Sequence, residues 1–377
     1  MADRYFDKVK DRKDLLVETD RVTDLNDKKW AHPDGAELFD LDPKLNEASR
    51  FMYDPNVPME EKIRVGTEKQ KAYMEEWWAK EHTCKIEEHK VPGCPEEPDT
   101  PATVWVVTPK TARPRKNRVM FYVIGGGIYS ENPNAYPIEE LSEKYNAVGI
   151  VVLYRMSWQA PYPAAINDLH AGYQWMVEHA EEIGIHPNKV VMSGCSSGAH
   201  LALSLAFRLK RYGYSPRGIV TVSAQVDDRE KDGEGWYTGI YDTIDEHDTL
   251  MQYLGRNFNS VLVGPEAMPN HASVEDCIGY PPVFMHQSEL DPDILRNLEF
   301  YGKLVKARSF AELHLYGGSI HNNSVWAGIK ATGELNDYSR QVADMYYKEI
   351  GYCYQYDLRR PWVVEEYKES LRKKFNL

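Results

Sequence analysis

The feature that most constrains the fold of this chain is a regular alternation of short apolar runs and helix-compatible stretches. The apolar runs, each of strand length, are 103–107, 118–123, 147–154, 189–192, 218–222, 283–286 and 311–316. The helix-compatible stretches are 138–145, 164–183 and 199–212. Nearly continuous apolar strands separated by helices are typical of a mostly parallel central sheet with helices on both faces. The sequence therefore predicts an α/β fold, with ligands bound beyond the carboxyl ends of the strands.

Outside this alternation the chain changes character at both ends and once in the middle. The N-terminal part is polar and helix-compatible, and Tyr73, Trp77 and Trp78 mark one apolar face that we expect to pack on the main domain. An acidic stretch rich in aromatic residues interrupts the alternation after 218–222. The predicted boundaries are 1–80 for a helical cap, 81–351 for the α/β domain, 227–271 for an insertion near its binding site, and 352–377 for a C-terminal extension.

Charge and motif content exclude several classes of protein. The chain has 45 Lys and Arg against 58 Asp and Glu, a net charge of −13, and no long basic run. Such a surface repels nucleic acids and anionic membranes. No stretch approaches 18 apolar residues, and the charged N-terminus lacks a signal core, so we expect a cytoplasmic protein. The 5 cysteines form no CxxC pair and the 12 histidines no HExxH motif, so no metal or other cofactor is predicted.

The sequence Gly194-Cys195-Ser196-Ser197-Gly198 sets three nucleophilic side chains between two glycines. An apolar strand leads into it and a helix-compatible run follows, which is the setting of a nucleophile elbow. The turn of an elbow is too sharp for side chains at its flanking positions, and it holds only its central residue out over the sheet. Ser196 is therefore the predicted nucleophile, Cys195 lies beneath the turn, and the backbone N–H of Ser197 donates to a developing oxyanion. By itself the G-x-S-x-G motif is weak evidence, because ordinary Gly and Ser usage produces it by chance in about one chain of this length in ten, as a small-residue turn.

A serine nucleophile needs a histidine base and an acid that orients it. Around an elbow these follow the serine in the order acid, then histidine, on loops after later strands. Asp291 follows the strand 283–286, and His321 follows the strand 311–316. Because both follow parallel strands, they should lie at the same edge of the sheet as Ser196. Glu289 and Asp293 remain alternatives to Asp291, and each of these residues could also be an ordinary surface group.

Three glycines, Gly125, Gly126 and Gly127, come directly after the strand 118–123. Glycines at a strand end let backbone N–H groups turn toward a ligand without interference from a Cβ atom. A flexible turn or a phosphate loop would use the same residues, but no G-K-[ST] or G-x-G-x-x-G pattern follows. The loop is therefore predicted to supply oxyanion donors, which contribute about 3 kcal/mol each when well placed.

Together these motifs resemble the hormone-sensitive-lipase-like carboxylesterases, a branch of the α/β-hydrolases with an HGGG loop. The resemblance runs from about residue 85 to 330 and rests on 124–127, 154–165, Asp168, the elbow and Asp291-Pro292. It implies an α/β-hydrolase fold in which residues 1–80 form an N-terminal cap that helps to shape the acyl pocket. The chain departs from the family where Ile124 replaces the loop histidine and Cys195 replaces an Asp or Thr, so a divergent substrate preference is expected.

The resemblance also implies roles for individual residues. It assigns Ser196, Asp291 and His321 to the catalytic triad, and Gly126, Gly127 and Ser197 to the oxyanion hole. Tyr129 and Trp158 are the predicted substrate contacts. We therefore expect a serine carboxylic-ester hydrolase that forms an acyl-enzyme on small or short-acyl esters, among them acetylated sugar or aryl esters.

Two alternatives stay open at this point. The same triad would serve an amidase, a lactonase or a carbohydrate deacetylase. A catalytically silent binding protein could also use the fold, although such receptors replace the histidine that is present here as His321. The expected partner is a small-molecule ester, and a homo-oligomer is compatible with the sequence.

Overall fold

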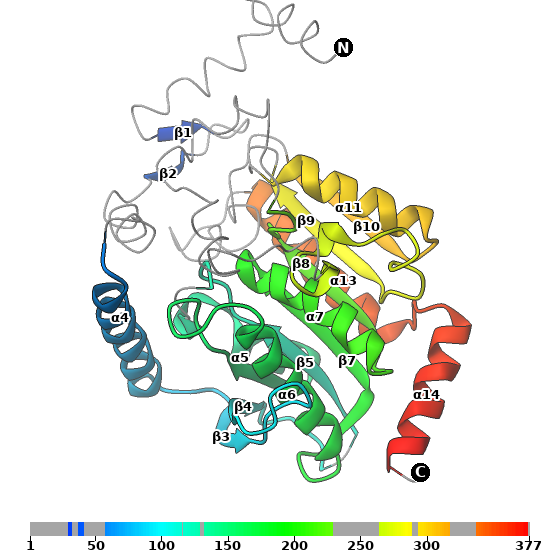
Figure 1. Ribbon diagram of the computed structural model, residues 1–377, viewed down its shortest axis with the longest axis horizontal. Coiled ribbons are helices and arrows are strands. Elements are labelled where there is room, and N and C mark those ends of the chain that lie inside the picture. The colour runs from blue at the N-terminus through cyan, green and yellow to red at the C-terminus, as the bar shows by residue number, and fades with distance from the viewer. Residues whose placement is uncertain are drawn as a thin grey trace, which may run out of the picture.

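The computed structural model describes residues 29–31, 37–40, 57–114, 116–128, 132–228, 264–288, 293–316 and 337–375. Its centre is an eight-stranded sheet with the order β10-β9-β8-β7-β5-β6-β4-β3 (Figure 1). The strands are β3 (Lys85–Val91), β4 (Ala102–Thr108), β5 (Asn117–Val123), β6 (Ala147–Leu153), β7 (Ile185–Cys195), β8 (Gly218–Val222), β9 (Val283–Ser288) and β10 (Ala311–Tyr316). β4 is antiparallel to both β3 and β6, and the pairs from β6 through β5, β7, β8 and β9 to β10 are parallel. The predicted mostly parallel sheet is therefore confirmed.

Every strand predicted from an apolar run is present, with small differences at the ends. β7 is longer than the predicted run 189–192. It begins at Ile185, before a partly exposed polar stretch, and ends at Cys195, next to Ser196. The strand β3, with the sequence KIEEHKV, was not predicted. Among the described residues it pairs only with β4, at the edge of the sheet, so charged residues can occupy its exposed positions and hide the strand pattern.

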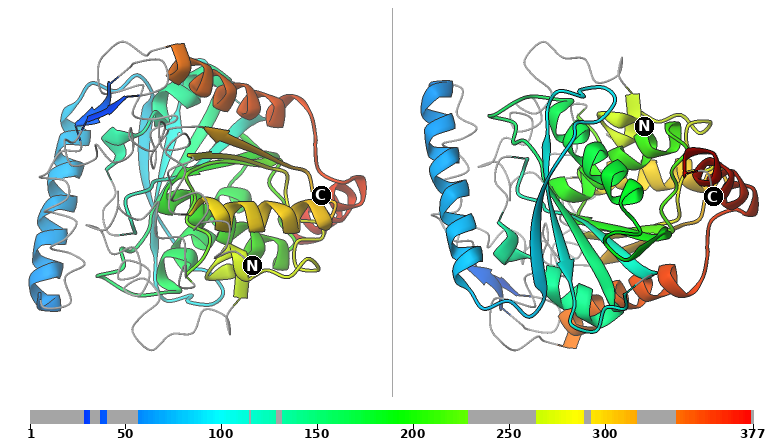
Figure 2. Two further views of the ribbon diagram at one scale, coloured as in Figure 1. Left: turned by 90° about the horizontal axis from the view of Figure 1, so that it is seen from above. Right: turned by 90° about the horizontal axis from the view of Figure 1, so that it is seen from below.

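Helices cover both faces of the sheet (Figure 2). One apolar core combines the sheet with α6 (Ala164–Glu178), α7 (Ser197–Arg211) and α11 (Ile294–Lys306). The other combines it with α5 (Ile138–Tyr145) and α13 (Asp337–Gln355). Successive residues of a strand alternate between the two cores, so that Phe121 packs in the first and Tyr122 in the second. Because both faces are covered, the central strands are apolar on both sides.

The helix α4 (Met59–Ala79) follows the N-terminal region and lies along one side of the domain (Figure 2). Trp77 is fully buried and stacks on Trp105 of β4, with the ring centroids 5.5 Å apart. Trp78 is 45% exposed, so the predicted apolar face packs through Trp77 and only partly through its neighbour. Two short strands, β1 (Lys29–Ala31) and β2 (Glu37–Asp40), pair within the region that was expected to be helical, and that expectation is wrong for these residues.

The predicted insertion 227–271 is described only at its two ends. Residues 264–271 form the short helices η3 (Gly264–Glu266) and η4 (Pro269–His271), and residues 229–263 lie outside the described part of the chain. The N–H of Asn270 donates to the carbonyl of Val226 at 2.8 Å, and its side chain donates to Asp227 at 2.7 Å. The two ends of the segment are therefore side by side.

The C-terminal part of the described chain consists of α13 and α14 (Pro361–Phe375). α13 packs in the second core through Tyr346, Ile350 and Cys353, so the predicted boundary at residue 351 falls inside a helix that belongs to the domain. Tyr367 and Leu371 of α14 pack on the first core. Among the helices described, none has both the length and the apolar content needed to cross a membrane.

Candidate active site

The turn between β7 and α7 places Ser196 in an unusual backbone conformation. Its φ and ψ angles are 56° and −129°, outside the regions that residues with a Cβ atom ordinarily occupy. Its N–H donates to the carbonyl of Val222 on the adjacent strand β8, and its own carbonyl accepts from the N–H of His200. Such strain costs about 1–3 kcal/mol and persists only where the surrounding structure imposes it. The conformation is that expected of an elbow residue.

Burial separates Ser196 from every residue around it. From Val190 to Leu209 each residue is buried except Ser196. Cys195 is 1% exposed and packs in the core that includes α5 and α13, whereas Ser197 is fully buried at the start of α7. The turn thus presents one hydroxyl and hides the thiol and the hydroxyl on either side of it.

Close backbone contacts explain why glycines flank the turn. A Cβ atom at Gly194 would lie 2.4 Å from the carbonyl oxygen of Gly198, and one at Gly198 would lie 2.3 Å from that of Val123. A Cβ atom at Gly125 would lie 2.1 Å from the carbonyl oxygen of Cys195. These distances exclude any side chain, as the sequence pattern suggested. They also show that the end of β5 and the elbow touch backbone to backbone.

The glycine loop lies against the elbow and is held there by the Ser197 side chain. Ser197 Oγ accepts hydrogen bonds from the N–H groups of Gly126 and Ile128, both at 3.1 Å. Gly126, Gly127 and Ile128 all have positive φ angles, of 133°, 67° and 57°. The predicted oxyanion residues are therefore brought together, but the Gly126 N–H is directed at a serine hydroxyl. Sequence reasoning gave Ser197 only a backbone role and missed this contact.

Ile124, the residue at the position of the family's loop histidine, is fully buried in the second core. Its carbonyl accepts a hydrogen bond of 2.6 Å from the hydroxyl of Tyr154. The residue before the glycines is thus fixed by packing and by a hydrogen bond from the side chain of Tyr154, which directly follows β6. The loop therefore has its supports in Tyr154 and Ser197, where the family has a histidine side chain.

A charged cluster holds the segment that follows β6. Arg155 donates to Asp168 of α6 at 2.8 Å and to Glu97 at 2.6 Å, and the Glu97 carboxylate also accepts from Asn167. The Arg155 guanidinium is the main reason that the pKa of Glu97 is lowered to about 2. Asp168 was identified as a family position, but its partners were not predicted because they are distant in sequence.

Trp158, a predicted substrate contact, lies in the same segment and is 6% exposed. Gly66 of α4 approaches its indole so closely that a Cβ atom there would lie 2.7 Å from the ring. Asn134, in the short helix η2 (Pro133–Ala135) after the glycine loop, donates to the carbonyl of Tyr73 of α4 at 3.3 Å. α4 therefore contacts the segments that follow both β5 and β6. Tyr129, the other predicted contact, lies outside the described residues.

Asp291, Glu289 and His321 also lie outside the described residues, but the strands that lead to them are described. β9 ends at Ser288 and β10 ends at Tyr316, and these two residues are register partners in adjacent parallel strands. Because β7, β8, β9 and β10 are neighbours and parallel, their carboxyl ends share the edge at which Ser196 stands. The described alternative, Asp293, is 1% exposed at the start of α11.

His200, one helical turn after Ser196, is a structural histidine. It is fully buried, and its Nε2 lies 2.8 Å from the carbonyl oxygen of Ala267, so this nitrogen carries the proton and donates. Burial lowers the pKa of His200 to about 4, so the ring is neutral near pH 7. Its proximity in sequence to Ser196, the predicted nucleophile, therefore does not make His200 a candidate base.

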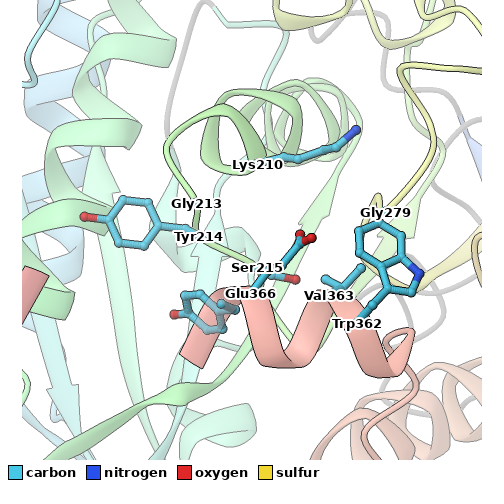
Figure 3. Close-up of a pocket in the computed structure, with 9 residues that line it drawn as sticks. Lys210, Gly213, Tyr214, Ser215, Gly279, Trp362, Val363 and Glu366 are labelled. Carbon is cyan, nitrogen blue, oxygen red and sulfur yellow. The ribbon is translucent and has the colours of Figure 1, made fainter. Parts of the chain in front are cut away.

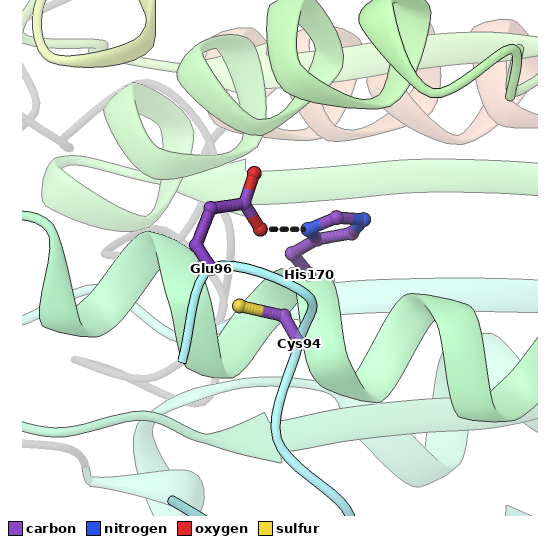
Figure 4. A group of neighbouring side chains, drawn as sticks. All are labelled: Cys94, Glu96 and His170. Atoms are coloured by element: carbon purple, nitrogen blue, oxygen red, sulfur yellow. Dashed lines mark hydrogen bonds and ion pairs between the residues drawn. The ribbon is translucent and has the colours of Figure 1, made fainter. Parts of the chain in front are cut away.

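Two other features of the structure lie apart from the elbow. Cys94, Glu96 and His170 have ligand atoms close enough to hold a metal (Figure 4). However, the Glu96 carboxylate already accepts from Tyr212 at 2.7 Å and from Arg211 at 3.1 Å, and it contacts His170 Nδ1 at 3.2 Å. Because these donors occupy the carboxylate and one of them is a guanidinium, this group does not fit a cation.

A small cleft of about 80 Å³ lies between the C-terminal end of α7 and α14, with Tyr214 and Trp362 in its lining (Figure 3). α7 has 15 residues, so its two ends are about 22 Å apart. Since Ser196 stands at the other end of α7, this cleft is not part of the candidate active site.

Comparison with known proteins agrees with this geometry. A family model for the α/β-hydrolase fold matches residues 120–324. Esterase LipU of Mycobacterium tuberculosis (strain ATCC 25618 / H37Rv) is 32% identical over 245 residues, which are 60% of this chain and 78% of that protein. Hormone-sensitive lipase of Bos taurus is 24% identical over 110 residues, 28% of this chain and 15% of that protein. Among solved structures, a bacterial heroin esterase superposes with a TM-score of 0.66 at 22% identity, over 83% of this chain and 98% of that one.

Proposed function

The chain belongs to the α/β-hydrolase family, in its hormone-sensitive-lipase-like carboxylesterase branch, and from this premise we propose that it is a serine ester hydrolase that works through an acyl-enzyme. The observation that carries the proposal is the partial exposure of Ser196, alone in an otherwise buried stretch from Val190 to Leu209 and at the strained turn between β7 and α7. The esterase relative that matches over most of its length supports the ester bond as the target.

In the proposed reaction His321 removes the proton from the Ser196 hydroxyl as its oxygen attacks the ester carbonyl. Asp291 holds the imidazole in the correct tautomer and stabilises its protonated form. The N–H groups of Gly126, Gly127 and Ser197 stabilise the oxyanion of the tetrahedral intermediate. The carbon–oxygen bond then breaks, and the alcohol leaves with the proton from His321. Water, deprotonated by His321, attacks the acyl-enzyme and releases the carboxylic acid and free Ser196.

One proposed oxyanion donor, the Gly126 N–H, already has an acceptor in the structure, because it donates to Ser197 Oγ. A carbonyl oxygen that takes on negative charge is a stronger acceptor than a serine hydroxyl. We therefore propose that the Gly126 N–H is shared between Ser197 and the oxyanion as charge develops, and that Ser197 holds the loop in place before the substrate arrives.

We propose small or short-acyl esters as substrates, with aryl and acetylated sugar esters the first to test. The net charge of −13 supports neutral small molecules over anionic lipid surfaces, which this chain repels. A panel of p-nitrophenyl esters of increasing acyl length, acetylated sugars, anilides and lactones would rank ester, amide and lactone hydrolysis on one enzyme preparation.

The test of the reaction is the variant Ser196→Ala, for which we expect kcat on p-nitrophenyl acetate to fall by at least about a thousandfold. Ser204→Ala is the matched control, since it removes a serine hydroxyl from the helix that follows the elbow but at a buried position about two turns further along α7. Turnover by Ser196→Ala at the wild-type rate would disprove the assignment. A wild-type protein that binds small esters yet neither hydrolyses them nor reacts with a fluorophosphonate would instead be a silent binding protein.

A further inference from the structure

Strand β10 forms one edge of the central sheet, beside β9 (Figure 1). Among the described residues it pairs only with β9, in parallel, from Ala311 to Tyr316. Its other side therefore presents a row of backbone N–H and C=O groups that another strand can bind. Charged residues discourage such pairing at the opposite edge strand, β3 (KIEEHKV), but β10 (AELHLY) has far fewer of them.

The hydrogen bonds to β9 show which backbone groups of β10 face outward. The carbonyl of Phe310 accepts from the N–H of Val283 at 3.0 Å, so the backbone groups of Phe310 face β9. In a strand the N–H and C=O of one residue point to the same side, and successive residues alternate between the two sides. Every second residue from Phe310 therefore bonds to β9. The intervening residues direct both groups outward, and these are Ala311, Leu313 and Leu315.

On one face of the sheet, exposed apolar side chains border this edge. Leu315 alternates onto the face that α11 covers. Lys303 of α11 donates to the carbonyl of Asn270, which lies beside the residues that follow β8, so this side of the helix faces the middle of the sheet. Val305 stands two residues further on, about 200° round the helix, and Leu298, seven residues before it, lies on the same outer side.

The helix α13 on the other face has the same arrangement. Tyr354 donates to the carbonyl of Val119 on β5 at 2.8 Å, so its side of the helix faces the middle of the sheet. Tyr352 is two residues earlier, about 200° away, and Met345 lies on its side. The outward apolar residues of β10, α11 and α13 are between 36% and 49% exposed, and they are Leu298, Val305, Leu315, Met345 and Tyr352. Apolar borders on both sides of a bare strand mark a surface for another protein.

A second copy of the chain fits this surface, because β10 is complementary to itself. In an antiparallel pair with a two-fold axis through Leu313, Leu313 faces its own counterpart and Ala311 faces Leu315 of the partner subunit. Every outward N–H and C=O of both strands is then paired. Glu312 lies opposite the partner's His314, in the non-hydrogen-bonded positions where side chains come closest. An axis one residue further on would leave Ala311 unpaired and would set the two His314 rings against each other.

The charges across this register are opposite. His314 forms an ion pair with Glu349 of α13, with Nε2 and Oε1 2.5 Å apart, and this contact raises the pKa of His314. The protonated ring is thus favoured, and its side chain is 22% exposed. Glu312 is exposed as well. Each side chain can therefore meet its opposite on the second copy, a match that a strand of unrelated sequence does not supply.

We propose that the chain forms a symmetric dimer in which two β10 strands pair antiparallel about Leu313 and join the two eight-stranded sheets into one. The outer sides of α11 and α13 pack against the same helices of the second copy. Neither the register nor the apolar borders involve the elbow or the glycine loop. The dimer and the ester hydrolase activity can therefore each fail without the other.

The first test is sedimentation equilibrium on the full, tag-free chain. At about 10 μM protein we expect a mass about twice the 43.4 kDa of one chain. Leu298→Lys should weaken the association at least about tenfold. Leu315→Pro removes an outward N–H that β9 does not use, a place where an edge strand tolerates proline, so this variant should fold as a monomer. Ile63→Lys is the matched control, because Ile63 is also 40% exposed but lies on α4, away from β10, and the dimer should persist.

The second test fixes the register. Paired residues of this kind have Cα atoms about 5.5 Å apart, within the range of a disulfide, so diamide should oxidise two thiols of Leu313→Cys to a disulfide between subunits. The matched control is Leu315→Cys, whose position is about 13 Å from its own counterpart in this register, so it should not link. The wild type should not link either, because its five cysteines are buried.

Circular dichroism would verify the fold of each variant, and Leu298→Lys carries the test if Leu315→Pro does not fold. A chain that stays monomeric up to about 100 μM would overturn the proposal. A dimer that both Leu298→Lys and Leu315→Pro leave unchanged would overturn it too, because the subunits would then meet through another surface. Linking of Leu315→Cys without linking of Leu313→Cys would refute the register.

Discussion

Removal of the Ser197 hydroxyl tests how the glycine loop is held against the elbow. In the structure Ser197 Oγ accepts the N–H groups of Gly126 and Ile128, each at 3.1 Å, and the serine is fully buried. In Ser197→Ala both N–H groups lose their acceptor, and that of the buried Ile128 lies where water does not readily replace it. Ile128 has a φ angle of 57°, which is strained for a residue with a Cβ atom, so the loop can relax toward a less strained conformation once these bonds are lost.

The size of the effect follows from the two hydrogen bonds. Each contributes about 0.5–1.5 kcal/mol net, so together they stabilise this loop conformation by about 1–3 kcal/mol. If the proposed oxyanion donors depend on that conformation, the loss appears in the transition state, where about 1.4 kcal/mol is a factor of ten in rate. We therefore expect kcat on p-nitrophenyl acetate to fall between about fivefold and about 150-fold, with little change in KM.

The assay compares kcat, KM and the free energy of unfolding in urea for the wild type, Ser197→Ala and Ser204→Ala. Ser204→Ala removes a buried hydroxyl from the same helix without touching the loop, so its kcat should remain near that of the wild type. An unchanged or increased kcat in Ser197→Ala would refute the reasoning. It would mean that the hydroxyl competes with the oxyanion for the Gly126 N–H instead of positioning the loop.

Three further changes have expected outcomes. Gly198→Ala places a Cβ atom 2.3 Å from the carbonyl oxygen of Val123, so activity should be lost and urea unfolding should show a loss of about 2 kcal/mol or more. Gly66→Ala places one 2.7 Å from the Trp158 indole, so tryptophan emission and KM for aryl esters should change more than kcat. Burial lowers the pKa of His170 to about 4 from about 6.5, so the folded protein keeps this ring neutral while the unfolded chain protonates it. The contribution of His170 to the free energy of unfolding is therefore unchanged above pH 6.5 and decreases by up to about 3 kcal/mol as the pH falls to 4. In urea unfolding curves, His170→Gln should remove that decrease.

Each of these outcomes has a control within the chain. Gly302→Ala in α11 adds a Cβ atom with nothing within 4 Å, so it should leave activity and stability intact where the other glycine substitutions do not. If Gly198→Ala or Gly66→Ala behaved like Gly302→Ala, the contacts assigned to those positions would be wrong. An acid-induced loss of stability that is the same in His170→Gln as in the wild type would assign it to other groups, among them His200.

The strands could be predicted from the sequence because a strand that is buried on both faces consists almost entirely of apolar residues. The central strands β5 and β8 read as continuous apolar runs since each of their faces packs in a core. The edge strand β3 carries charged residues at its exposed positions, so it does not form a continuous apolar run. The apolar-run pattern does not extend over α11 and α13, so it does not predict the helices that cover the sheet beside β9 and β10.

The candidate site was predictable only as far as local rules reach. Within the five residues of the elbow, the turn leaves no space for a Cβ atom at either flanking position. The distances at Gly194 and Gly198 confirm this steric requirement. The contacts of Ser197 with the loop, and of His314 with Glu349, join residues that are far apart in the chain. No periodicity encodes such pairs, because they depend on which strands become neighbours in the sheet.

The two adjacent serines of the elbow show how the backbone, and not residue type, divides the proposed chemistry. Ser196 stands at the strained turn and is only partly buried, and we propose that its hydroxyl meets the substrate and the base there. Ser197, one residue later, is the first residue of α7, and its side chain is buried and faces the glycine loop. One residue earlier, the thiol of Cys195 is more nucleophilic by type but is enclosed in the second core. These environments differ from one residue to the next along the backbone, so Ser196 and Ser197 cannot exchange roles. Substitution of Ser196 should impair formation of the bond to the substrate. Substitution of Ser197 should impair the positioning of the oxyanion loop.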